Sequence, residues 1–212
     1  MVATALESLR AALPSGVELV AVSKFHPVSR LMEAYNAGQR IFAESRPQEL
    51  ASKVPLMPQD VQWHFIGHLQ TNKLKLVLPY VSLVQSVDSF HLLQAINAWG
   101  ISNGRVVDVL LELHLGAEET KQGFTEDEIR AVPAGLSGVR IRGLMGMATN
   151  TDDMAVVEKD FERIERLFLE LKATNPSITE LSIGMSGDWP VAVRHHATMV
   201  RIGTDIFGPR EY

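Results

Sequence analysis

A lysine ends the first strand-like segment of the chain. Residues 17–24 (VELVAVSK) are mostly apolar and rich in valine, as is typical of a buried parallel strand. If Val20 and Val22 point inward, Lys24 does too, because side chains alternate along a strand. An ammonium at the apolar end of such a strand is partly desolvated, which favours the neutral amine that condenses with a carbonyl. The alternative is a strand-end lysine that reaches solvent or pairs with Glu44.

A second reactive segment lies near the C-terminal end of the sequence. Residues 184–188 (GMSGD) follow a strand-like run, and Trp189-Pro190 then opens a short helix. Backbone amides in a Gly-Ser turn before a helix bind anions, because those amides lack partners. The next strand-like run carries Arg201, followed by Gly203 and Thr204. The alternative is a simple turn with Asp188 as helix N-cap. Together the lysine and the anion turn favour a phosphorylated carbonyl ligand.

Other combinations of reactive residues do not match a catalytic, metal-binding or nucleotide-binding motif. Asp188 stands where a nucleophile elbow needs its last glycine, which disfavours a serine hydrolase. His64 and His68 are four residues apart, but His64 lies in a strand-like run, so the two do not share a helical face. His195 and His196 are adjacent and would diverge on a helix. We therefore expect no metal site, and no Gly-rich dinucleotide fingerprint or P-loop occurs.

Two carboxylates and a second lysine follow other strand-like runs. Glu44 and Asp88 stand at strand ends, where each would reach the site or cap the following helix. Lys121 lies in the loop after the fifth run and is either solvated or a secondary contact to the carbonyl ligand.

Strand-like and helix-like segments alternate along the chain. The strand-like runs are 17–24, 41–44, 63–67, 81–88, 106–115, 141–147, 180–186 and 198–207. The helix-like runs are 3–13, 28–37, 46–53 and 152–173, the last with apolar residues at three- and four-residue steps, an Asp152 or Asp153 cap and a stop at Asn175-Pro176. Such alternation predicts parallel strands with right-handed crossovers. We expect an α/β fold, a single (β/α)8 TIM barrel with an extra N-terminal helix, and an open doubly wound sheet is the alternative.

Composition narrows the class of protein. The chain has 212 residues, no cysteine, 46% hydrophobic residues and a formal net charge of -5. These values suit one domain over residues 1–212 and exclude thiol chemistry. No run of about 18 apolar residues and no secretory signal occurs, so we expect a cytoplasmic protein. The acidic balance disfavours nucleic acid as a partner.

Several of these segments resemble one family. They are VAVSK at 20–24, WHFIGHLQTNK at 63–73, SVDS at 86–89, RGLM at 142–145, GMSGD at 184–188 and MVRIGTDIFG at 199–208. In this order they resemble the pyridoxal 5′-phosphate (PLP) homeostasis proteins, whose barrel is similar to the N-terminal domain of alanine racemase. The resemblance spans the chain from the first strand nearly to the C-terminus.

The resemblance implies a cofactor and a set of site residues. PLP would form a Schiff base with Lys24, and its phosphate would lie against Ser186, Gly187, Gly203 and Thr204. Arg201 would face the pyridine nitrogen, and His64 and Met185 would line the pocket. One segment departs from the family, which commonly has Gly-Glu-Asn where this chain has Ala43-Glu44-Ser45. Ser45 is shorter and lacks the amide donor, which puts the contact made by that asparagine in doubt. Arg46-Pro47 also departs from the family's commoner pair.

The resemblance leaves carrier and enzyme as alternatives. A cationic Arg201 beside the pyridine nitrogen would disfavour its protonation and weaken the ring as an electron sink. The similar racemases add a second domain and a partner's tyrosine, for which we expect no room before Tyr212. The first hypothesis is therefore a non-catalytic, monomeric protein that binds PLP reversibly and passes it to apo-enzymes. The alternatives are a weak PLP-dependent racemase or lyase, and an aldolase in which Lys24 attacks a sugar phosphate.

Overall fold

Parallel strands close on themselves in the computed structural model of this chain, which describes residues 1–116 and 122–209. The strands, in order around the barrel, are β1 Glu18–Val22, β2 Ile41–Glu44, β3 Gln62–Phe65, β4 Val81–Val87, β5 Val107–Leu113, β6 Val139–Gly146, β7 Glu180–Ser182 and β8 Met199–Ile202. Because β8 pairs with β1, the sheet has no free edge. The expected closed barrel is confirmed, and the open doubly wound sheet is excluded.

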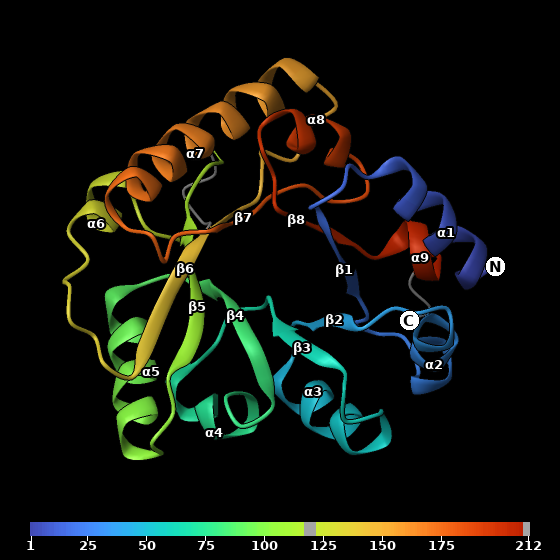
Figure 1. Cartoon of the computed structure of the whole chain (residues 1–212), viewed down its shortest axis with the longest axis horizontal. Coiled ribbons are helices and arrows are strands. Elements are labelled where there is room, and N and C mark those ends of the chain that lie inside the picture. The colour runs from blue at the N-terminus through green and yellow to red at the C-terminus, as the bar shows by residue number, and fades with distance from the viewer. Residues whose placement is uncertain (117–121, 210–212) are drawn as a thin grey trace.

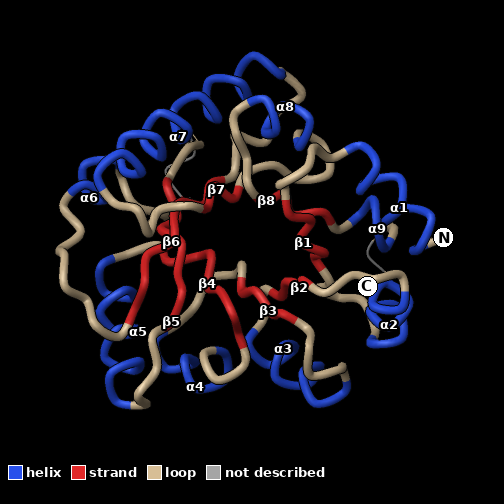
Figure 2. Tube along the Cα trace, viewed as in Figure 1, coloured by secondary structure: helices blue, strands red, loops and turns tan. Residues whose placement is uncertain are grey.

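Helices surround the barrel on its outer side (Figures 1 and 2). They are α1 Val2–Ala12, α2 Val28–Asn36, α3 Pro47–Lys53, α4 Leu74–Val77, α5 Phe90–Ser102, α6 Glu126–Arg130, α7 Met154–Thr174, α8 Trp189–Arg194 and α9 Thr204–Phe207, with 3-10 turns at Val54–Leu56 and Thr71–Lys73. The expected extra helix is α1, which precedes β1 and packs against α2 and α9. No helix in the described ranges is long and apolar enough to cross a membrane.

The strand-like segments 180–186 and 198–207 end four and five residues earlier than the sequence predicts, the largest differences among the strands. The run 198–207 leaves the sheet after Ile202, and Thr204–Phe207 form α9 instead. The run 180–186 leaves the sheet after Ser182 and turns at Gly184, whose φ of 91° is a left-handed conformation. In both places apolar character continues into a turn, and apolar character by itself cannot separate a strand from a buried turn.

The helix α7 follows its sequence prediction closely. Asp153 is the N-cap, and its carboxylate accepts a hydrogen bond from the amide of Ala155. The helix ends at Thr174, before Asn175-Pro176. Its buried face (Val157, Phe161, Ile164, Leu167 and Phe168) packs in the apolar layer between the barrel and the helices.

The interior of the barrel is a second apolar cluster with polar groups embedded in it. The cluster consists of Val20, Val22, Ala43, Leu83, Leu110, Met145 and Met199. The side chains of His64, Gln85, Ser182 and Arg201 are also buried. They form a chain of hydrogen bonds: the Gln85 amide pairs with the His64 ring, Ser182 donates to Gln85, and Arg201 donates to Ser182. Burying polar groups is tolerated here because each finds a partner.

Candidate functional site

The expected site residues gather at the mouth of the barrel, meaning the C-terminal ends of its strands. Lys24 follows β1, Ser45 follows β2, residues 184–188 follow β7, and Gly203-Thr204 follow β8. These four strands are consecutive neighbours in the closed sheet. The loops that carry the lysine and the anion turn therefore meet at one end of the barrel, where catalytic and binding residues of such folds gather.

Lys24 lies two residues beyond the last residue of β1. Val20 and Val22 belong to the interior cluster, so the inward alternation that the sequence predicts for β1 is present up to Val22. The Lys24 side chain is partly buried. The chain then turns sharply at Phe25, whose φ of 69° is unusual for a residue with a side chain.

A buried network of charged and polar groups supports the Lys24 loop from below. The Lys53 ammonium lies 2.7 Å from Glu44 Oε1 and 2.7 Å from Glu49 Oε1, and it donates to the Ser23 carbonyl oxygen at 2.9 Å. Ser23 Oγ donates to Glu44 Oε1, and the Phe25 amide donates to Glu49 Oε1, both at 2.6 Å. The sequence left two roles open for Glu44, reaching the site at the mouth or capping the following helix. The structure shows neither, because the side chain is buried in this network.

Burial dominates the electrostatics of Glu44. It raises the pKa of the carboxyl group, while the charge of Lys53 and the hydrogen bonds from Lys53 and Ser23 act in the opposite direction. Glu44 Oε2 is buried and has no hydrogen-bond partner in the described part of the chain. The network thus ties the residues on both sides of Lys24 to α3 and β2.

The anion turn at residues 184–188 is closed by its own aspartate. Asp188 Oδ1 accepts from the Met185 amide at 2.5 Å, and the Asp188 amide donates back to the Met185 carbonyl at 3.1 Å. The side chain of Asp188 makes no capping hydrogen bond to α8. Within the described ranges, the amides of Ser186 and Gly187 have no acceptor, and a Cβ at Gly187 would meet no atom within 4 Å. Two amide donors therefore remain available next to open space.

Arg201 lies beneath the mouth with its guanidinium engaged. It pairs with Val20 in the sheet and points into the barrel. Its NH1 group lies 2.7 Å from both the carbonyl oxygen and Oγ of Ser182, and NH2 donates to the Gly146 carbonyl at 2.9 Å. Burial lowers the pKa of Arg201 to about 10, so the group stays positively charged at neutral pH.

His64 and Ser45 occupy different levels of the barrel. His64 Nδ1 lies 2.9 Å from Gln85 Nε2, which must donate, so the proton of the neutral ring is on Nε2. Burial lowers the pKa of His64 to about 4. The ring lines a cavity of about 180 Å³ with residues from the N-terminal ends of the strands. Ser45 lies at the mouth against Gly67, where a Cβ would come within 2.1 Å of the Ser45 carbonyl oxygen.

One charged residue at the mouth, Glu112, is not among the site residues predicted from the sequence. It pairs with Met145, a member of the interior cluster, and burial raises its pKa to about 7. The sequence contains an indication of it, because Glu112 lies two residues after Leu110 on one strand, and side chains two residues apart share the same face. Lys121, the expected secondary contact, lies outside the described residues. Among those residues, no group of three or more side chains is arranged to hold a metal ion.

Comparisons with known proteins identify the family. The alanine racemase N-terminal domain family matches residues 2–211. The pyridoxal phosphate homeostasis protein of Vibrio alginolyticus is 38% identical over 207 residues, which cover 94% of this chain and 89% of that protein. PipY of Synechococcus elongatus PCC7942, solved without PLP, has a TM-score of 0.92 and 38% identity and covers 98% of this chain and 100% of that one. Its PLP-bound structure has a TM-score of 0.89 at 37% identity and the same coverage.

The shared barrel and the identity along almost the whole chain both point to the same family. The chain belongs to the alanine racemase N-terminal domain family and, within it, to the pyridoxal phosphate homeostasis proteins.

Proposed function

We propose that this protein binds pyridoxal 5′-phosphate reversibly, without catalysing a reaction of its own, and so serves vitamin B6 homeostasis. Lys24 would hold the aldehyde through a reversible Schiff base at Nζ. The phosphate would lie against Ser186, Gly187, Gly203 and Thr204. Ser45 and Met185 would complete the lining of the site, and His64 would act from deeper in the barrel through its hydrogen-bond chain to Gln85, Ser182 and Arg201.

One observation carries this proposal: the barrel brings a partly buried lysine after β1 and a turn with unpaired amides after β7 to one end of the barrel, with only β8 between the two strands. The amides of Ser186 and Gly187 lack acceptors, and Gly187 leaves open space beside them. Amides of this kind bind phosphate because their donors are unsatisfied and oriented outward. PipY, which is 37% identical and similar over its whole length, has been solved with PLP bound.

Arg201 supports a role without catalysis. PLP supplies an electron sink when its ring nitrogen is protonated. A guanidinium opposite that nitrogen opposes protonation by like-charge repulsion. Arg201 is held in place by three hydrogen bonds to backbone and hydroxyl oxygens, and its pKa of about 10 keeps it charged. A ring held this way would stabilise a substrate carbanion poorly.

The setting that we propose is a cytoplasmic monomer that limits free PLP and passes it to PLP-dependent apo-enzymes. The acidic composition and the occupied sheet edges are consistent with that setting, since neither offers a nucleic-acid surface or an open strand.

The test is the visible absorption spectrum of the purified protein, before and after borohydride, with the labelled peptide mapped. We expect a reducible chromophore whose label maps to Lys24. Lys24→Ala should abolish it while cooperative unfolding is retained. Lys75→Ala, an exposed lysine of α4, is the matched control and should leave the spectrum unchanged. A protein that stays colourless with added PLP, or a label on another lysine, would overturn the proposal.

A further inference from the structure

A second cavity opens at the mouth, on the side of β3, β5 and β6. Its volume is about 220 Å³, enough for a small molecule of several heavy atoms. Its lining consists of Ile66, His68, Glu112, Leu113, His114, Leu115, Gln122 and Met147. Apart from the predicted phosphate turn, this is where polar side chains of the mouth converge.

Glu112 of β5 and His114, the residue after the end of that strand, both line this cavity. Leu110 is part of the interior cluster, and Glu112 follows it by two residues on the same face. His114 follows by two more, just beyond the end of β5. The Nδ1 atom of His114 is buried and has no hydrogen-bond partner in the described ranges. A buried polar atom without a partner is costly and is explained by a ligand or a water.

A buried aspartate adds negative charge next to the cavity. The Asp88 side chain is only 7% exposed, and its Oδ2 atom lies 2.9 Å from Nδ1 of His68, a lining residue. Its other oxygen accepts from Ser89. Burial is the main reason that the pKa of Glu112 is raised to about 7, and the charge of Asp88 raises it further. Arg201 and His68 act on Glu112 in the opposite direction.

The acceptor groups of the cavity, the Glu112 carboxyl and Nδ1 of His114, favour a cationic donor as the ligand. The charged or titratable groups are Glu112, Asp88, Arg201, His68 and His114. Two of them are carboxyl groups, and Arg201 is the guanidinium that opposes them. Arg201 donates hydrogen bonds to Ser182 and to Gly146, which hold its guanidinium in place. An ammonium group would form an ion pair with Glu112 and donate a further hydrogen bond to Nδ1 of His114.

We propose that this cavity binds the ammonium group of a small primary amine, with Glu112 as its main acceptor. The site is separate from the predicted phosphate turn, but Arg201 interacts electrostatically with Glu112 and with Asp188 of that turn. The idea that such an amine accepts PLP from the protein depends on the proposed function, whereas binding of the amine itself does not.

The experiment is an NMR titration of histidine-labelled protein with n-propylamine, following the ring signals of His68 and His114. Propanol and propionate serve as the neutral and anionic ligands of similar size. Wild type and Lys24→Ala are both titrated, so that the result does not depend on covalent cofactor binding. We expect saturable shifts with n-propylamine in both proteins and weaker effects with the other two compounds.

Variants test the role of Glu112 directly. Glu112→Gln keeps the size of the side chain and should weaken n-propylamine binding at least tenfold. Asp127→Asn, on a side chain that is 97% exposed, removes one negative charge elsewhere and should have no effect. Gln122→Trp at the exposed rim of the cavity should also weaken binding, by obstruction, without touching the core.

The pH dependence separates this site from unspecific attraction. Since an ammonium prefers the ionised carboxylate, affinity should rise between pH 6 and 8 in wild type and rise clearly less in Glu112→Gln. Preferential binding of propionate, or equal affinities in wild type and Glu112→Gln, would overturn the inference. Absence of a Lys24 chromophore from the wild-type protein, with amine binding intact, would instead refute only the proposed function.

Discussion

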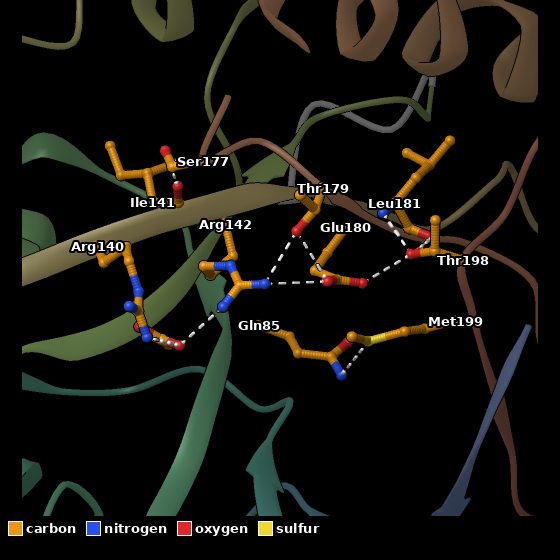
Figure 3. Close-up of polar contacts among 11 residues, drawn as sticks. Gln85, Arg140, Ile141, Arg142, Ser177, Thr179, Glu180, Leu181, Thr198 and Met199 are labelled. Atoms are coloured by element: carbon orange, nitrogen blue, oxygen red, sulfur yellow. Dashed lines mark hydrogen bonds and ion pairs between the residues drawn. The ribbon is translucent and has the colours of Figure 1, made fainter. Parts of the chain in front are cut away.

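The two ends of the barrel differ in whether their polar groups have hydrogen-bond partners. At the base, meaning the N-terminal ends of the strands, Arg140 binds Asp108 through two contacts of 2.7 and 2.8 Å. Arg142 also contacts Asp108 and reaches Glu180 at 3.3 Å, as Figure 3 shows. At the mouth, by contrast, the amides of Ser186 and Gly187 have no acceptor in the described ranges.

A bulge and a glycine produce the closed network at the base. The register between β5 and β6 skips Arg142, so that this side chain lines the lower cavity and reaches both acids. Gly143 allows the close approach of β7, since a Cβ there would lie 1.7 Å from the Glu180 carbonyl oxygen. Thr179 and Thr198 donate to the Glu180 carboxylate. Polar groups that satisfy one another stabilise a fold, whereas unpaired donors at the mouth are free to bind a ligand.

The largest loss of stability is expected where the mouth is supported from below. Lys53→Met leaves Glu44 buried without its cation, and we expect the free energy of unfolding to fall by about 3 kcal/mol or more. The Lys24 loop should loosen as well, so PLP binding should weaken. Urea unfolding and a PLP titration measure both effects. Lys75→Met, on an exposed residue, is the control, and equal behaviour of the two variants would contradict the role of this network.

The buried ring of His64 should make the barrel sensitive to acid. Its pKa is about 4 in the folded protein, against an ordinary value near 6.5. Between about pH 6.5 and pH 4, His64 is protonated in the unfolded chain but stays neutral in the folded chain. Stability is therefore lost as the pH falls from about 6.5 to 4, by up to about 3 kcal/mol. Unfolding by urea at pH 4.5 and 7 should show a smaller difference in His64→Gln than in wild type, and identical differences would contradict the assignment.

A single hydroxyl at the mouth should affect the ligand more than the fold. If Thr204 donates to the phosphate, Thr204→Val should weaken PLP binding by about 1 kcal/mol, or roughly fivefold. The melting temperature without PLP should barely change, because Thr204 is exposed. Thr4→Val, an exposed residue of α1, is the control for the substitution itself. Unchanged affinity would remove Thr204 from the phosphate site.

The smallest effect is expected at the base. Arg140 is 55% exposed, so Arg140→Gln should cost at most about 1 kcal/mol of stability despite the two-point contact with Asp108. The spectrum of bound PLP should remain that of the wild type. A clear loss of PLP affinity in this variant would show that the two ends are coupled and would break the contrast drawn between them.

Much of the barrel follows from local patterns in the sequence. Periodicity places the strands and α7, because the apolar face of each element repeats with that element's own geometry. The same argument directs Lys24 toward the mouth, whereas the turn at residues 184–188 is identified by its glycines and serine before a short helix. Where the prediction is wrong, as at Thr204–Phe207, an apolar run continues through a glycine into a helix.

Only the tertiary structure decides which distant residues meet. Lys53 pairs with Glu44, and Asp88 lies beside His68 and raises the pKa of Glu112. These pairs come from different elements, and their contacts depend on barrel closure and on register shifts, as between Val109 and Leu110. A pattern of period two fixes the face on which a side chain lies. It does not fix which side chain of another strand lies opposite, because that depends on how all the strands close together.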